Sequence, residues 1–234
     1  MLSQKFWEKY FKVYDVLNIV IPYQELISEL EKDLDLNQGD IVLDVGSGTG
    51  NLMMRLKDKC KKIIGLDFSE TGIKIHKAKD SLAEVICCDI TKKLPFPDEY
   101  FSKVVSNNVI YTLNKEDQKK VVSEIYRVLK PEGKFVISNV RKDFSPVKIY
   151  LDHISKSIRN IGVTKTIVMF FSLVMPTAKM FYYNIKIKNS GATKQYNFFV
   201  PGEQKIFLEK NGFGKVSEEK FIYSNQAIMN NCYK

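Results

Sequence analysis

Three glycines and two aspartates stand where backbone and carboxylates can hold a ligand that contains a nucleoside. Gly46, Gly48 and Gly50 follow directly on a short apolar run, which is typical of a strand ending in a tight turn. Glycine lets the backbone approach a ligand closely, and the helix that follows offers free N–H groups to negative charge. Asp67 and Asp89 end the next two strand candidates, where a carboxylate can accept the hydroxyls of a ribose. The glycine spacing is GxGxG rather than the GxGxxG of the dinucleotide fingerprint, and together with Asp67 and Asp89 it predicts a nucleoside-containing cofactor, with NAD-dependent reduction as an alternative.

These residues need a framework, and short apolar runs alternate with helical patterns along the first part of the chain. We expect strands at 41–45, 63–66, 84–88, 103–106 and 134–138, and helices near 51–59, 69–79 and 115–129. Asn114 is the expected N-cap of the last helix. Alternation of this kind predicts an α/β fold whose parallel sheet is covered on both faces. The segments 215–223 and 227–233, separated by a short turn, predict a closing antiparallel hairpin.

Residues 141–200 interrupt this alternation. An insertion of about sixty residues is too long for a plain loop, so we expect it to carry its own helices. The predicted organisation is therefore N-terminal helices and a cofactor-binding core over 1–140, a basic and apolar lid over 141–200, and a final helix with the closing hairpin over 201–234.

The segment 43–50, Leu-Asp-Val-Gly-Ser-Gly-Thr-Gly, resembles the first motif of the class I S-adenosylmethionine-dependent methyltransferases. The segments 65–69 and 125–135 are similar to that family's second strand end and to its helix–turn–strand unit. The opening, 14–18, is similar to the ubiquinone/menaquinone-type and phospholipid-type small-molecule members. The resemblance implies a Rossmann-like, seven-stranded, mostly parallel sheet with an inserted helical lid, and S-adenosylmethionine as cofactor with S-adenosylhomocysteine as product.

The resemblance also assigns residues to the cofactor. Asp44 and the glycines would border its methionine part, Asp67 would bind the ribose, and Phe68 would lie against the adenine. Tyr14 would cover the methionine end. The full set that the resemblance implies is Tyr14, Asp44, Gly46, Ser47, Gly48, Gly50, Asp67, Phe68, Asp89, Ile90 and Asn107.

Methyl transfer is an in-line displacement that depends mainly on alignment, and it needs a general base only when the nucleophile must lose a proton. His153, within the insertion, is a candidate base, although a structural role fits it as well. Tyr111 follows the fourth strand, where this family often lines the substrate pocket, and core packing is the alternative. His76 lies among lysines, which predicts a solvated helix face. No metal site is expected.

The charge is uneven along the chain. The net charge is +9, yet residues 1–140 hold 21 basic and 21 acidic side chains, whereas 141–200 holds 10 basic and 2 acidic. The same insertion contains the apolar run Thr166–Met175. We therefore expect a small, largely apolar, anionic or lipid-like acceptor and peripheral contact with an anionic membrane. An RNA methyltransferase and a non-catalytic cofactor-binding module are the alternatives; the atom methylated and the oligomeric state stay open.

The four cysteines have neither zinc-ligand spacing nor the pattern of a disulfide framework. The charged opening lacks the apolar core of a signal peptide, and the apolar run 166–175 is about half the length of a membrane span. The expected location is the cytoplasm, with peripheral membrane contact.

Overall fold

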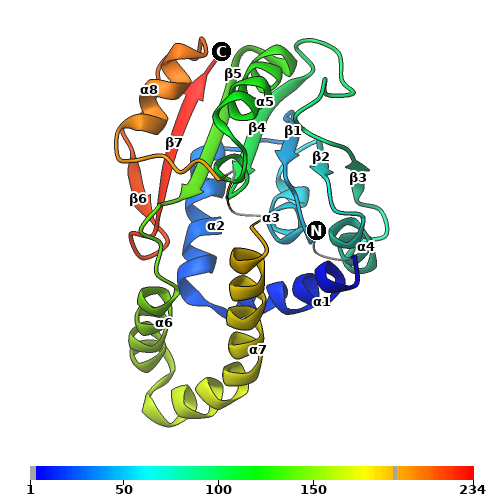
Figure 1. Cartoon of the computed structure of the whole chain (residues 1–234). Helices are drawn as coiled ribbons and strands as arrows, with labels where there is room; N and C mark the ends of the chain where they lie inside the picture. Colours follow the sequence, from blue (N-terminus) through cyan, green and yellow to red (C-terminus); the bar gives the residue numbers. More distant parts are fainter. Residues whose placement is uncertain (1–3, 192–193, 195) are drawn as a thin grey trace.

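The protein, described at residues 4–191, 194 and 196–234 in a computed structural model, is built around one twisted sheet with helices on both faces (Figure 1). The strands are β1 (Ile41–Val45), β2 (Lys62–Asp67), β3 (Glu84–Cys87), β4 (Phe101–Asn107), β5 (Leu129–Val140), β6 (Lys220–Ile222) and β7 (Ala227–Tyr233). The longer helices are α1 (Gln4–Tyr14), α2 (Ile21–Leu34), α3 (Asn51–Leu56), α4 (Glu70–Lys79), α5 (Lys115–Val128), α6 (Pro146–Ile161), α7 (Val163–Asn189) and α8 (Glu203–Lys210). Short 3₁₀ turns occur at η1 (Asp15–Ile19), η2 (Lys57–Lys59) and η3 (Ile110–Thr112).

The sheet has the order β3-β2-β1-β4-β5-β7-β6. The pairs from β3 to β5 are parallel, and β7 is antiparallel to both β5 and β6. This arrangement confirms the predicted seven-stranded α/β fold with its closing hairpin. After β1 the chain builds outward through β2 and β3, then returns to add β4 on the other side. Ligands of open α/β sheets bind outside the carboxyl ends of the strands at such a switch point.

Alternation along the central strands divides the apolar core between the two faces of the sheet. In β1, Val42 packs into the core beneath α2 and α3, whereas Leu43 packs into the core beneath α5. The apolar stripe of α5 is fully buried there, and the Asn114 side chain accepts a hydrogen bond from the Asp117 N–H at 2.9 Å, as the predicted N-cap. Local capping and binary patterning thus agree with the tertiary arrangement.

The insertion forms two antiparallel helices, as its length predicted. Pro146 occupies the first turn of α6, and Gly162, at φ +80°, separates α6 from α7. Figure 1 shows this hairpin projecting away from the sheet, beyond α2, with the end of α7 returning toward α1. We call residues 146–189 the arm.

Candidate functional site

The carboxyl ends of four parallel strands bring the predicted cofactor residues to one edge of the sheet. Asp44 of β1 is in register with Gly65 of β2 and with Val105 of β4. Asp67 ends β2 opposite Cys87, so the loop that carries Asp89 leaves from the same edge. The order along the edge is therefore the β3, β2, β1 and β4 ends. Residues 46–50, which we call the glycine loop, follow β1 and lie beside the switch point.

The glycine loop is shaped by its backbone conformation. Gly46 has φ +84°, and a Cβ there would come within 2.2 Å of the Val109 side chain. Gly48 has φ +53°, and a Cβ there would meet nothing within 4 Å. Both positions therefore favour glycine for their dihedral angles, while Gly48 in addition leaves its face of the loop open to an approaching ligand.

Asp67 ties the glycine loop to the end of β2. Its Oδ2 accepts a hydrogen bond from the Gly48 N–H and its Oδ1 one from the Ser69 N–H, both at 2.7 Å. Burial raises the pKa of Asp67, and these two N–H donors oppose that rise. Because a carboxylate has about four lone-pair positions, each oxygen can still accept a hydroxyl.

Asp44 is the most unusual carboxyl group of the site. It is 2% exposed, and among the described residues its Oδ2 has no hydrogen-bond partner. Burial, followed by the negative charge of Asp67, raises the pKa of Asp44 to about 7. A buried carboxylate that lacks a partner is costly, and a cationic ligand group would offset this cost. The Ser47 hydroxyl beside it is likewise buried and unpartnered within the described chain.

The other predicted cofactor positions lie around this centre. Phe68 is 78% exposed, which leaves its ring available for stacking. Asp89 is exposed, and its Oδ1 accepts hydrogen bonds from the backbone N–H and the hydroxyl of Thr91; Ile90 next to it is buried. Asn107 ends β4, where its Oδ1 accepts a bond from Ser138 at 2.7 Å.

His76 corrects one expectation. It is 1% exposed rather than solvated, because the α4 face that carries it packs against the glycine loop. A Cβ at Gly50, which has φ +83°, would lie 2.2 Å from the His76 ring. His76 therefore packs beneath the loop, and burial lowers its pKa. Lys74 and Lys77 are exposed, whereas Lys79 donates hydrogen bonds to the Thr49 carbonyl and to Asn51 beside the same loop, so lysines near His76 in sequence do not make its helix face solvated.

Tyrosines form a cluster beside the cofactor edge that the sequence did not reveal. Ring centroids are 5.9 Å apart for Tyr10 and Tyr14, 5.6 Å for Tyr111 and Tyr196, and 6.2 Å for Tyr23 and Tyr223. Burial, followed by the neighbouring Asp67 and Asp15 carboxylates, raises the pKa of Tyr14 to about 12. Burial also raises the pKa values of the other members of this group: Tyr10, Tyr23, Tyr111, Tyr196 and Tyr223.

The cluster is assembled from segments far apart in the chain. Tyr14 ends α1, Tyr111 lies in η3, and Tyr223 lies in the β6–β7 turn. No local motif connects them, so only the fold brings them together. All of their phenols are neutral at physiological pH, which gives this side of the site an aromatic and uncharged lining.

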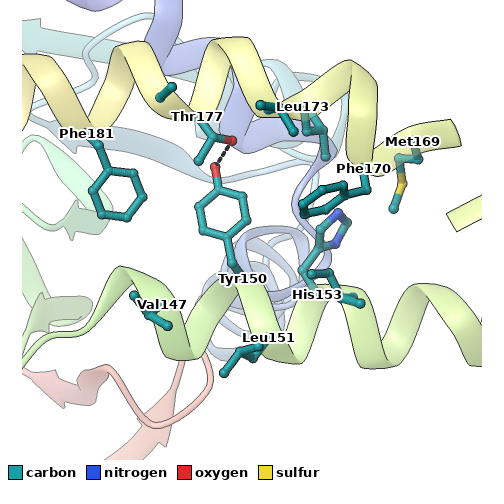
Figure 2. Close-up of a pocket in the computed structure, with 12 residues that line it drawn as sticks. Val147, Tyr150, Leu151, His153, Met169, Phe170, Leu173, Thr177 and Phe181 are labelled. Carbon is teal, nitrogen blue, oxygen red and sulfur yellow. Dashed lines mark hydrogen bonds between the residues drawn. The ribbon is translucent and has the colours of Figure 1, made fainter. Parts of the chain in front are cut away.

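His153 lies on α6 with the imidazole turned toward α2 and α7. It is 1% exposed, and its Nδ1 accepts a hydrogen bond from the Ile21 N–H at 3.2 Å, at the start of α2. Figure 2 shows its ring beside Phe170 of α7. Because Nδ1 accepts, a neutral imidazole carries its proton on Nε2, which is then a donor. Burial lowers the pKa of His153 and so favours this neutral form.

Comparison with known proteins gives consistent findings. The family described as Methyltransferase domain matches residues 43–137. A demethylmenaquinone methyltransferase of Bacillus cereus is 26% identical over 239 residues, which cover 95% of this chain and 91% of that protein.

Solved structures share the fold. A Thermotoga maritima S-adenosylmethionine-dependent methyltransferase, described as a possible histamine N-methyltransferase, superposes with a TM-score of 0.62 at 19% identity, covering 99% of this chain and 100% of its own. Phosphoethanolamine N-methyltransferase 2 of Haemonchus contortus, in complex with S-adenosyl-L-methionine, gives 0.54 at 19% identity, covering 84% of this chain and 38% of that one.

Proposed function

We propose that this chain, which is a class I S-adenosylmethionine-dependent methyltransferase, transfers the methyl group to an apolar, quinone-type ring. The observation that carries the proposal is the cluster of neutral tyrosines at the cofactor edge of the sheet. Such a lining suits a flat, uncharged acceptor, because aromatic faces stack on one another and phenol groups can orient ring oxygens.

The residues at the sheet edge fit the cofactor. The unpartnered Asp44 carboxylate suits the ammonium group of the methionine part, and the open face of Gly48 allows close approach. Asp67 can accept the ribose hydroxyls on its remaining lone pairs, while the exposed Phe68 ring is free to stack on adenine. We propose that Asp89, Ile90 and Asn107 border the base and the amino group.

When bound, S-adenosylmethionine supplies an electrophilic methyl group on a positively charged sulfur. The work left to the chain is to align the acceptor with that methyl and to exclude water from the reacting centre. Tyr14 is suited to this task, because its ring packs at the apolar core and its phenol lies near Asp67 and Asp15.

The relatives support the choice of acceptor class. The sequence relative from Bacillus cereus acts, by name, on demethylmenaquinone, and the similarity to it extends across 95% of this chain, the arm included. A prenylated quinone is largely apolar, as we expect of the acceptor from the composition of residues 141–200. RNA as the acceptor is not favoured, because the exposed stretch of α7 between Lys165 and Lys179 is apolar and contains no cation that could pair with phosphates.

Two residues remain candidates for catalysis. We propose that Tyr111 borders the acceptor, since its phenol faces Tyr14 and Tyr196 in the cluster. His153 would serve as a base only through a ring nitrogen that now either accepts the Ile21 N–H or carries the proton. The contact with α2 therefore supports a positioning role for His153, and the choice between base and positioning residue is put to the test below.

Labelled methyl transfer into a cell extract tests this proposal. The enzyme is incubated with methyl-labelled S-adenosylmethionine and the extract is separated into organic, nucleic-acid and water-soluble fractions. We expect label in the organic phase, and none when Asp67→Ala replaces the wild type. Label confined to RNA or to a water-soluble amine would overturn the assignment of the acceptor.

A further inference from the structure

The tip of the arm exposes an unusual amount of apolar surface. Six aliphatic and aromatic side chains around the Gly162 turn are each at least 41% exposed, and Val168 and Phe171 reach 71%. The six are Ile158, Ile161, Val163, Ile167, Val168 and Phe171. They come from both helices, so the tip as a whole, rather than one helix face, is apolar. Contiguous exposed apolar surface of this kind marks an interaction site.

The two helices of the arm are also loosely packed against each other. Cavities of about 320 and 360 Å³ lie between α6 and α7, and apolar side chains make up nearly all of their walls. Figure 2 shows the residues that line the cavity of about 320 Å³, with the hydrogen bond between Tyr150 and Thr177 connecting the two helices. The cavity of about 360 Å³ lies at the tip, so a partner that covers the tip meets an irregular apolar surface.

Positive charge predominates along the arm, and two cations flank its apolar tip. The arm holds seven basic residues and one acidic residue, Asp152. Its carboxylate forms an ion pair with Lys156 and accepts a hydrogen bond from the Ser224 hydroxyl. Arg159 and Lys165 are exposed on either side of the turn, and within the described residues neither forms an ion pair with a carboxylate. These cations remain free to pair with negative charge on a partner.

An anionic lipid surface matches both properties. Its hydrocarbon accepts apolar side chains without a fixed shape, and its phosphate groups pair with the cations. A second copy of this chain fits less well, because two tips of the same positive charge would face each other. We propose that the tip of the arm docks on an anionic membrane, with its apolar side chains in the interface and Arg159 and Lys165 at the phosphates.

Docking, rather than spanning, follows from the structure of α7. Residues Val163–Ile187 are long and apolar enough to cross a membrane by length and composition, and most of this segment is not buried in the protein. However, Lys165, Lys179 and Lys186 interrupt this segment, and Leu173 and Ile187 are buried within the protein. Cations near both ends of an apolar segment that is partly packed on the protein favour a helix that lies in the interface.

Co-sedimentation with lipid vesicles tests the proposal directly. The full chain is mixed at low salt with vesicles of phosphatidylglycerol and phosphatidylcholine, and separately with vesicles of phosphatidylcholine alone. We expect the V168D/F171D variant to bind the anionic vesicles at least about tenfold more weakly, because two apolar side chains leave the interface. R159E/K165E is expected to lose at least about tenfold on anionic vesicles and little on neutral ones.

Leu82→Asp is the matched control, since Leu82 is 88% exposed in the turn between α4 and β3. It should bind vesicles as the wild type does, and all variants should bind S-adenosylhomocysteine normally. Wild-type levels of vesicle binding by both arm variants would overturn the proposal. A dimer that V168D/F171D dissociates in sedimentation would overturn it as well, by assigning the tip to a second copy. Vesicle binding does not depend on the acceptor, so the proposed function and the docking surface can fail separately.

Discussion

Replacing Asp44 with asparagine should stabilise the protein and weaken its cofactor binding at once. Asn keeps the shape of the side chain but removes the buried charge that has no partner among the described residues. The pKa of Asp44 is raised from 3.8 to about 7 in the folded protein. A group whose pKa is raised by folding contributes stability below its unfolded pKa and loses it as the pH rises through the folded value.

The magnitude follows from this shift. Because folding raises the pKa of Asp44 from 3.8 to about 7, the ionised group lowers the unfolding free energy of the cofactor-free wild type by about 4 kcal/mol above pH 7. Asp44→Asn avoids that loss. Its advantage over the wild type should therefore approach about 4 kcal/mol at about pH 8, and should shrink by roughly 1.4 kcal/mol for each pH unit below 7.

Cofactor binding should respond in the opposite sense. An ammonium group binds the ionised carboxylate, so the wild-type affinity for S-adenosylhomocysteine should fall about fivefold between pH 7 and pH 6, about tenfold more between pH 6 and pH 5, and level off above about pH 8. Asp44→Asn should bind more weakly at high pH, with a nearly flat profile. Chemical denaturation and calorimetric titration across this range measure both effects. A variant that is less stable than the wild type at high pH, yet keeps full affinity, would refute the reasoning.

Further substitutions separate roles within the site. Gly46→Ala should lose about 2 kcal/mol or more of unfolding free energy in chemical denaturation, because its Cβ overlaps Val109 at a positive φ. Gly48→Ala, whose Cβ meets open space, should lose less unfolding free energy. Calorimetric titration should show that Gly48→Ala loses more affinity for S-adenosylhomocysteine than Gly46→Ala does. His153→Asn keeps an acceptor near the Nδ1 position and should keep its turnover, whereas His153→Ala should lower the free energy of unfolding by about 1–3 kcal/mol. Loss of turnover in His153→Asn, with its stability unchanged, would instead identify His153 as a base. Tyr111→Phe should raise KM for the acceptor and leave the affinity for S-adenosylhomocysteine intact, and a change confined to cofactor affinity would place Tyr111 elsewhere.

The sequence predicts the elements whose signals are local. The strand ends at Asp67 and Asn107, the Asn114 cap and the closing hairpin all follow from short patterns, because periodicity and capping act within a few residues. His76 could not be placed in this way, since its burial depends on the glycine loop packing across α4.

The tyrosine cluster shows the same limit at the site. Tyr10, Tyr23, Tyr196 and Tyr223 meet only because α1, α2, the segment after α7 and the β6–β7 turn converge. The sequence could not predict either that Asp44 Oδ2 lacks a hydrogen-bond partner among the described residues, because a motif gives the position of a carboxylate but not its hydrogen bonds. The composition of residues 141–200 did predict a basic and apolar segment. Which of its apolar side chains are exposed at the tip could be seen only in the folded structure.

Turnover of a defined acceptor tests the central claim most directly. The purified enzyme is incubated with S-adenosylmethionine and reduced demethylmenaquinone in mixed micelles, and the quinone is analysed by mass spectrometry for the gain of one methylene unit. We expect one methylated quinone for each S-adenosylhomocysteine formed, and no methylated product from Asp67→Ala. Binding of S-adenosylhomocysteine with no methylation of this quinone, alongside methylation of a water-soluble acceptor, would contradict it.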